Sequence, residues 1–117
     1  MYVLVNSKTF SAAEYFSYSL QALRRAVIVG ERTKGGAHPV DVVIIDGDIL
    51  AQISIGNSVN PVTGTNWETN GVQPDIETAS EDALQAAYRK ALERILEKTQ
   101  DPEYKKDLQL ILAKQKR

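Results

Sequence analysis

The sequence predicts an α/β fold in which a parallel strand–helix–strand unit is followed by a β-hairpin and two C-terminal helices. Three observations indicate this order. Within residues 2–30, two short apolar runs rich in β-branched side chains flank an amphipathic segment. Further along, the turn sequence Asp46-Gly47-Asp48 separates two more apolar segments. The last third of the chain repeats apolar residues at helical spacing.

The first strand is predicted at residues 2–5, which are apolar throughout and are followed by a polar turn. We interpret it as a central parallel strand covered on both faces. Because the chain opens directly on this strand, we expect it to be a piece of a longer protein. A second buried strand is predicted at residues 26–29, closed by Gly30, and the crossover that joins the two strands should be right-handed.

A helix is predicted from about residue 12 to 24, between these strands. One face carries apolar residues at i, i+4, i+8 and i+11, which we expect to pack on the core. They are Ala12, Phe16, Leu20 and Leu23.

An antiparallel hairpin is predicted from residues 42–45 and 49–55 around the turn at residues 46–48. Residues 57–70 are rich in Asn and Thr and also contain Pro61, Gly64 and Trp67, which predicts a long irregular loop. Loops of this length in a compact domain are often functional.

Two helices are predicted at about residues 81–98 and 103–115. Asp101 suits the cap of the second one, and Pro102 is tolerated at the first helical position. The residues after 113 are predicted to be a frayed, solvated helix end. The expected apolar stripes are Leu84, Ala87, Tyr88, Ala91, Leu92 and Ile95 in the first helix, and Tyr104, Leu108, Ile111 and Leu112 in the second.

Composition excludes several classes of function. The 117 residues fit one domain, and a hydrophobic content of 43% is typical of a chain with a core. With 14 basic and 15 acidic residues the net charge is -1, so we expect no nucleic-acid partner. The apolar runs are far shorter than the roughly 20 residues of a membrane-spanning helix, and no membrane span is expected. The chain has no cysteine, which excludes disulfides and thiolate metal sites.

The stretch Ser11-Ala-Ala-Glu14 lies directly between a predicted strand and a predicted helix. Its commoner explanation is a capping box, in which Glu14 reaches back to the amide of Ser11. The same position places a hydroxyl beside free N–H groups and the positive end of the helix dipole, which could stabilise an oxyanion. A serine also needs a neighbouring proton acceptor to attack, and the local pattern contains none. The capping and catalytic interpretations both stay open on this pattern.

His38 is the only histidine and lies in a glycine-rich loop. A lone histidine in such a loop is more often exposed or bonded to backbone than a catalytic base. One histidine without clustered carboxylates cannot form a closed metal site, so no metal is expected. The complete phosphate-binding loop pattern is absent, and no nucleotide or other cofactor is expected.

Several runs in one consistent order resemble peptidase family S41. They are Val3-Leu-Val-Asn6, Phe10-Ser-Ala-Ala-Glu14, the sequence AVIVGERT at 26–33 with Gly35-Gly36, SVNPVTGTNWE at 58–68, and GVQPD at 71–75. This family contains tail-specific and C-terminal processing proteases, tricorn core proteases and interphotoreceptor retinoid-binding protein modules. The resemblance implies a ClpP/crotonase-like fold, with residues 1–78 as the C-terminal part of the catalytic domain. Residues 79–117 would then be a helical extension packed on the same domain.

The resemblance also implies roles for individual residues. Ser11 falls on the nucleophile of the family, and the N–H of Ala12 would contribute to the oxyanion hole. Glu68 matches a catalytic glutamate downstream of the nucleophile. The tail-specific branch takes a lysine as its base, but Gly36 stands at that position here, and Lys34 lies two residues early, so its amine should point elsewhere. The other branch takes a histidine from an earlier segment, which His38 does not match.

We therefore expect a fragment of a serine-type endopeptidase that cleaves peptide bonds through an acyl-enzyme on Ser11 and is inactive in isolation. The alternative is a non-catalytic module that binds an apolar ligand such as a retinoid or fatty acid. The expected partners are a peptide or protein substrate, the missing N-terminal part of the same domain, and a second copy of the chain paired through open strand edges. The chain itself carries no localisation signal, and the resemblance implies a parent in the periplasm or cell envelope.

Overall fold

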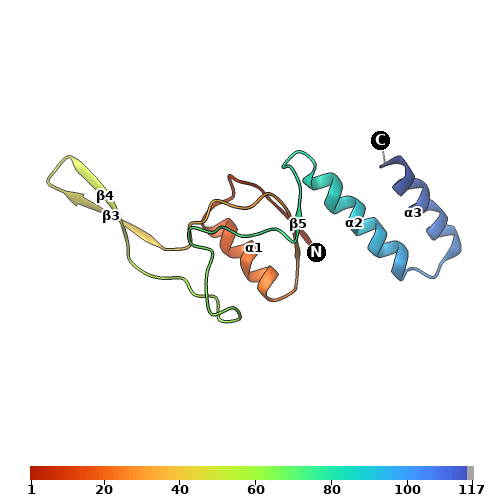
Figure 1. Ribbon diagram of the computed structural model, residues 1–117, viewed down its shortest axis with the longest axis horizontal. Helices are drawn as coiled ribbons and strands as arrows, with labels where there is room; N and C mark the ends of the chain where they lie inside the picture. The colour runs from red at the N-terminus through yellow and green to blue at the C-terminus, as the bar shows by residue number, and fades with distance from the viewer. Residues whose placement is uncertain (116–117) are drawn as a thin grey trace.

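The computed structural model describes residues 1–115, so residues 116–117 of the predicted frayed end lie outside the described part. The α/β prediction is confirmed, with a parallel sheet, a hairpin and two C-terminal helices (Figure 1). Among residues 1–115, no helix combines the length and apolar character needed to cross a membrane. The elements are β1 (Tyr2–Val5), α1 (Ala12–Ala22), β2 (Val27–Gly30), β3 (Val40–Ile45), β4 (Ile49–Ser54), β5 (Ile76–Glu77), α2 (Ala83–Lys98) and α3 (Pro102–Lys114).

The main sheet has three parallel strands in the order β1-β2-β5. The predicted strand–helix–strand unit is confirmed, with Val3 paired to Ile28 and Val5 to Gly30. Strand β5 was not predicted, because two residues after a proline-containing loop present no strand-length apolar run. The prediction that the first strand is central was wrong for this chain: β1 lies at the sheet edge and its Leu4 is 44% exposed. An apolar run identifies a strand but not its neighbours.

Strand β2 is the strand that is covered on both faces. On one face Ile28 packs with Trp67, Val72 and residues of α1. On the other face Val29 packs with Ala83 and Ala87 of α2. The alternation of side chains along a strand thus produces two small apolar clusters, one on each side of the sheet.

Helix α1 does not bury the face that its apolar stripe predicted. Its fully buried residues are Glu14 and Ser17, whereas Phe16 is 54% and Leu23 is 56% exposed. The rotation has a polar cause, since the Glu14 carboxylate is held from the inside by four hydrogen bonds. Of the predicted stripe only Leu20 packs against the core, and the other three residues are exposed.

The hairpin prediction is confirmed, although strand β3 begins at Val40 rather than at 42 and β4 ends at Ser54. The two strands pair antiparallel, with Ile45 opposite Ile49. Asp46 and Gly47 in the turn have φ of 49° and 67°, which an Asp-Gly pair accommodates. The hairpin extends away from the sheet at one end of the molecule, as Figure 1 shows. Its side chains are exposed, apart from a half-buried Ala51.

The C-terminal helices form the opposite end of the molecule (Figure 1). Helix α2 buries Ala83, Ala87 and Leu92, and α3 buries Leu108. The predicted cap is confirmed, because Oδ1 of Asp101 accepts the N–H of Glu103 at 2.9 Å. Of the predicted stripes, several large side chains are more than a third exposed in this chain: Leu84, Tyr88, Ile95, Tyr104 and Ile111. The division at residue 78 stays a prediction.

The molecule is long and thin. Its radius of gyration is 19.3 Å and its extents are 70 × 31 × 17 Å. A compact chain of this length has a radius of gyration of about 13 Å. The accessible surface is 8322 Å², against roughly 6,300 Å² for a compact monomer of 13.0 kDa. Both differences come from the two ends of the molecule (Figure 1). The hairpin strands pair only with each other, and the C-terminal helices extend away from the small central sheet.

Candidate active site

Ser11 lies at the turn between β1 and α1, where parallel strands present their carboxyl ends. Its φ of 55° and ψ of −118° are values that side chains other than glycine seldom adopt. The N–H of Ser11 donates to Oε2 of Glu14 at 2.8 Å, which is the returning half of the predicted capping box. The Ser11 side chain completes the capping box by facing the backbone N–H of Glu14, although the two atoms lack the geometry of an ordinary hydrogen bond. Ser11 is exposed, and its turn is strained.

A small pocket opens beside this turn. It has a volume of about 230 Å³ and is lined from α1 by Ser11 and Ala12, and from the loop after β2 by residues 36–39. The N–H of Ala12 donates to no group among the described residues. A free N–H next to the serine is the arrangement that an oxyanion requires. Ser11 and Ala12, which the sequence singled out, thus line one pocket.

Glu14 forms the polar centre of the site and has no exposed surface. Its Oε1 accepts the Thr33 hydroxyl at 2.5 Å and the Gly35 N–H at 2.6 Å. Its Oε2 accepts the N–H groups of Ser11 and Gly36, at 2.8 and 2.9 Å. Burial raises the pKa of Glu14, but these four hydrogen bonds outweigh burial and hold its pKa below the ordinary value. The side chain is therefore a buried anion satisfied by neutral donors.

Glu68 lies on the far side of the same loop. Its Oε2 accepts the Ala37 N–H at 2.6 Å and the His38 N–H at 2.9 Å. These two hydrogen bonds hold the pKa of Glu68 below its ordinary value. Ala37 and His38 also line the Ser11 pocket. No hydrogen bond joins Glu68 to Ser11 within the part of the chain described, so the two residues are connected through this loop.

The two candidate bases are placed differently. The amine of Lys34 lies over the ring of Phe10, 5.0 Å from its centroid, and Lys34 does not line the pocket. His38 does line it, together with Ser11. The amine of Lys34 is thus directed elsewhere, as its two-residue offset indicated, and the histidine of the glycine-rich loop is the one that the fold brings to the serine.

Sequence reasoning missed three contributors to this site. Glu14 was assigned only a cap, and Thr33, which accepts the Val72 N–H at 2.7 Å while donating to Glu14, was not assigned a role. Trp67 was recognised only as the large aromatic of the loop, yet it is 2% exposed and its indole N–H donates to the Gly36 carbonyl. The two adjacent glycines were a signal that the backbone is closely packed here, because a Cβ at Gly36 would lie 2.1 Å from the Phe10 ring.

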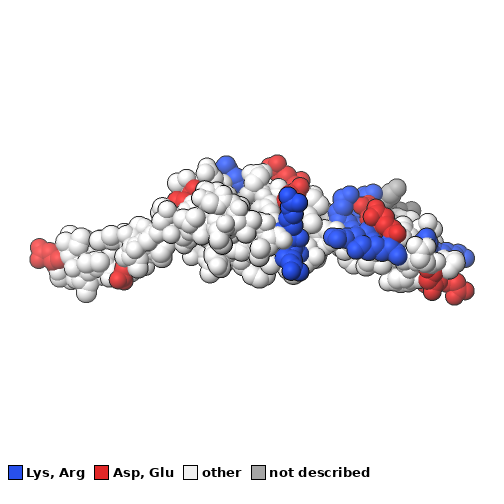
Figure 2. Space-filling view, turned by 90° about the horizontal axis from the view of Figure 1, so that it is seen from below, with Lys and Arg blue, Asp and Glu red and all other residues white. Residues whose placement is uncertain are grey.

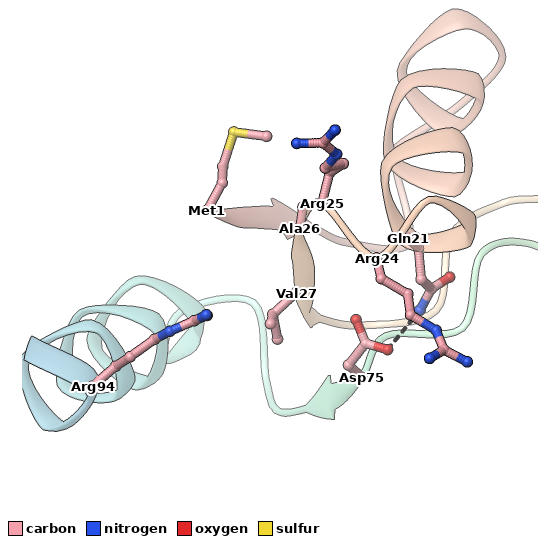
Figure 3. Close-up of a pocket in the computed structure, with 8 residues that line it drawn as sticks. All are labelled: Met1, Gln21, Arg24, Arg25, Ala26, Val27, Asp75 and Arg94. Atoms are coloured by element: carbon pink, nitrogen blue, oxygen red, sulfur yellow. Dashed lines mark hydrogen bonds between the residues drawn. The ribbon is translucent and has the colours of Figure 1, made fainter. Parts of the chain in front are cut away.

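A second cavity, of about 400 Å³, lies at the opposite ends of the strands (Figure 3). Figure 3 shows Gln21 of α1 bonded to Asp75, with Arg24 and Arg94 among the residues that line it. Asp75 has a structural role there, because its Oδ2 accepts the N–H of Ile28. This cavity is larger than the Ser11 pocket, but it contains no nucleophile. Within residues 1–115, no cluster of three or more potential metal ligands occurs.

The domain thus combines a parallel α/β sheet with an exposed serine at a strand-to-helix turn. The chain belongs to peptidase family S41, whose model matches residues 1–78. Among solved structures it is similar to a photosystem II D1 C-terminal processing protease, with 30% identity and a TM-score of 0.58 over 68% of this chain and 20% of that one.

The chain is also similar to mature CPAF, with 28% identity and a TM-score of 0.60, over 80% of this chain and 19% of that chain. The structure of mature CPAF complexed with lactacystin gives 29% identity and a TM-score of 0.61, over the same shares. The chain thus spans about a fifth of the length of these proteins. The expected family and fold are confirmed.

Proposed function

We propose that this chain supplies the nucleophile and part of the oxyanion hole of a serine-type endopeptidase. Oγ of Ser11 attacks the carbonyl carbon of a peptide bond while a base accepts the hydroxyl proton. The N–H of Ala12 stabilises the oxyanion, the amine leaves with a proton from the base, and an ester on Ser11 remains. Water then hydrolyses this acyl-enzyme and returns the proton to Ser11.

The observation that supports this proposal best is the backbone of Ser11. A non-glycine residue with φ of 55° and ψ of −118° carries strain that a mere helix cap does not need. The strain directs the hydroxyl outward beside the free N–H of Ala12. In α/β-hydrolases, too, a strained strand-to-helix turn presents the nucleophilic serine.

The proposed role of Glu68 is to orient the base network through its charge. Its Oε2 is engaged by two backbone amides, whereas Oε1 makes no hydrogen bond among the described residues. That oxygen is thus available to a base brought by another part of the protein. Because no base is bonded to Ser11 in the described part, we propose that the isolated chain hydrolyses peptides negligibly.

Labelling with a serine-reactive phosphonate tests this proposal. We expect rapid labelling of a full-length parent protein, and none after Ser11→Ala, because the reagent requires an activated hydroxyl. The chain of residues 1–117 should label at least 100-fold more slowly, as ~10² or more is typical for a missing general base. Ser17→Ala is a matched control that should not alter labelling, since the Ser17 hydroxyl is buried and bonded to backbone. A parent without Ser11-dependent labelling would contradict the proposal.

The alternative, a module that binds a retinoid or fatty acid, finds little support in the pocket. A volume of about 230 Å³ is below the ~300–1,000 Å³ that small-molecule sites commonly have. Tight retinoid or fatty-acid binding by a parent that takes no label would nevertheless favour it. A homo-oligomer, docking to further residues of the same domain, and a periplasmic or cell-envelope location stay proposals.

A further inference from the structure

The mechanism proposed above leaves one buried ionisable side chain without a role. Glu14 has no exposed surface, and neither of the two ion pairs among the described residues involves it. Burying a carboxylate without a cation is costly unless hydrogen bonds compensate. An apolar residue at this helix position would avoid that cost. The four donors around Glu14 therefore point to a specific use for the carboxylate.

The hydrogen bonds of Glu14 connect two segments that are far apart in the sequence. Its Oε2 accepts one N–H from the Ser11 turn and one from Gly36 in the pocket wall. Its Oε1 accepts the Thr33 hydroxyl and the Gly35 N–H from the same loop, just before the residues that line the pocket. One carboxylate thus joins the serine turn to the loop on the other side of the pocket.

Glu68 holds the remainder of this loop. The N–H groups of Gly35 and Gly36 donate to Glu14, and those of Ala37 and His38 donate to Glu68. Four successive backbone amides are therefore divided between two carboxylates. The carbonyl groups on this loop are also bonded, since Gly36 O accepts the Trp67 indole N–H and Gly35 O accepts the Thr69 N–H. Residues 35–38 form a fixed pocket wall.

We propose that Glu14 is a positioning residue that sets the spacing between Ser11 and the wall formed by residues 35–38. Because a single side chain binds both, the serine turn and the wall are held as one rigid unit. The proposal deepens the function proposed above and rests on it, since this spacing matters for catalysis only if Ser11 reacts with a group held in the pocket. Glu14 itself touches no reacting atom and is not a catalytic residue.

The chemistry of the site makes a carboxylate necessary. All four neighbours of Glu14 are donors, so both of its oxygens must accept. Glutamine would present an NH₂ group to two of these neighbours. The Thr33 hydroxyl can turn to accept it, but a backbone N–H cannot, so in either orientation of the amide Gly35 or Gly36 loses its acceptor. Aspartate keeps the charge but is one methylene shorter, so it can reach back to the Ser11 amide without also reaching the wall. Glu68 differs, because only one of its oxygens is used, and the amide oxygen of glutamine can replace it.

Amide hydrogen exchange on the 117-residue chain, followed by NMR, tests this assignment. In Glu14→Gln we expect the protection of at least one of the Gly35 and Gly36 amides to fall at least about ten-fold, because a buried donor loses its acceptor. The Val29 amide, inside β2, reports on the intact sheet and should change less. Glu68→Gln is the matched control, with exchange at residues 35–38 expected within about two-fold of the wild type.

Glu14→Asp gives a second, milder readout. We expect the Ser11 amide to stay protected while Gly35 and Gly36 lose protection, which is a separation that general unfolding would not produce. Gly35 and Gly36 amides as protected as the wild type in both Glu14 variants would overturn the proposal. So would a loss in Glu68→Gln as large as that in Glu14→Gln. Phosphonate labelling of Ser11 in the parent decides the proposed function separately, since amide exchange in this chain does not depend on catalysis.

Discussion

The Ser11 site and the β3–β4 hairpin are stabilised in opposite ways. At the site, the segments are joined by buried polar contacts, such as the hydrogen bond from Thr33 to Glu14. Every buried side-chain nitrogen or oxygen in the described part of the chain has a hydrogen-bond partner. In the hairpin, the strands are paired only with each other, and their apolar side chains face solvent.

Both faces of the hairpin are apolar. Val42, Ile44 and Leu50 lie on one face, and Val43, Ile45, Ile49 and Ile53 on the other. Its charges are Asp41, Asp46 and Asp48. Figure 2 accordingly shows acidic but no basic side chains at the hairpin end of the face drawn. A two-stranded hairpin is marginally stable alone, so this region depends on contacts outside itself, whereas the site carries its own contacts.

The largest expected effect comes from removing the polar centre of the site. Glu14→Ala should lower the free energy of unfolding by about 3 kcal/mol or more, because several buried donors lose their acceptor at roughly 1–3 kcal/mol each. Urea unfolding followed by the fluorescence of Trp67, the only tryptophan, measures this change at the site itself. Glu93→Ala is the control and should cost under about 0.5 kcal/mol, since its ion pairs are exposed. Equal costs for the two variants would remove the contrast between site and surface.

The second-largest effect is expected at low pH, which should lower the stability of the site. The pKa of Glu14 and that of Glu68 lie below the ordinary 4.5 in the folded chain. Their stabilisation is therefore fully present above pH 4.5 and is lost as the pH falls through the lower folded values. The urea midpoint seen by Trp67 should decrease with pH below 4.5 in the wild type and less steeply in Glu14→Gln. A midpoint that rises or stays constant down to pH 3 would show that these carboxylates are not stabilising anions.

Relieving the strain at Ser11 should stabilise the chain by about 1 kcal/mol. Glycine adopts a positive φ without the penalty of a side chain, so Ser11→Gly should raise the urea midpoint. Ala13→Gly, at the second residue of α1, is the matched control and should cost about 1 kcal/mol because glycine has a low helix propensity. If Ser11→Gly also destabilises the chain, the serine turn is not strained.

The smallest effect on site stability is expected from the hairpin. Ile44 and Leu50 face each other across the strands. The double variant Ile44→Lys with Leu50→Glu should change the free energy of unfolding detected by Trp67 by less than about 0.5 kcal/mol. The same double variant should reduce self-association in sedimentation velocity, because it removes an exposed apolar pair. Leu84→Lys removes an exposed apolar side chain outside the hairpin, 67% exposed, and serves as the control for loss of apolar surface elsewhere. A large loss of site stability in the double variant would show that the hairpin supports the site.

The local elements could be predicted from the sequence. Apolar runs of four residues gave β1 and β2, the turn at residues 46–48 gave the hairpin, and Asp101 gave the start of α3. It also placed Ser11 at a strand-to-helix turn. These features depend on neighbours within a few residues, so periodicity and turn chemistry are sufficient to predict them.

The contacts between distant segments could not be predicted from the sequence and are seen only in the folded chain. Strand β5 forms because β2 offers it a free edge, and α1 turns its Glu14 side inward because donors from residues 33–36 surround the carboxylate. The same local pattern, Ser-Ala-Ala-Glu, would serve as a simple cap in another setting. Hydrogen bonds to backbone amides leave almost no trace in the sequence, because every residue except proline carries that donor. For this reason the roles of Glu14, and the link from Glu68 to the Ser11 pocket through residues 37–38, became visible only in the folded chain.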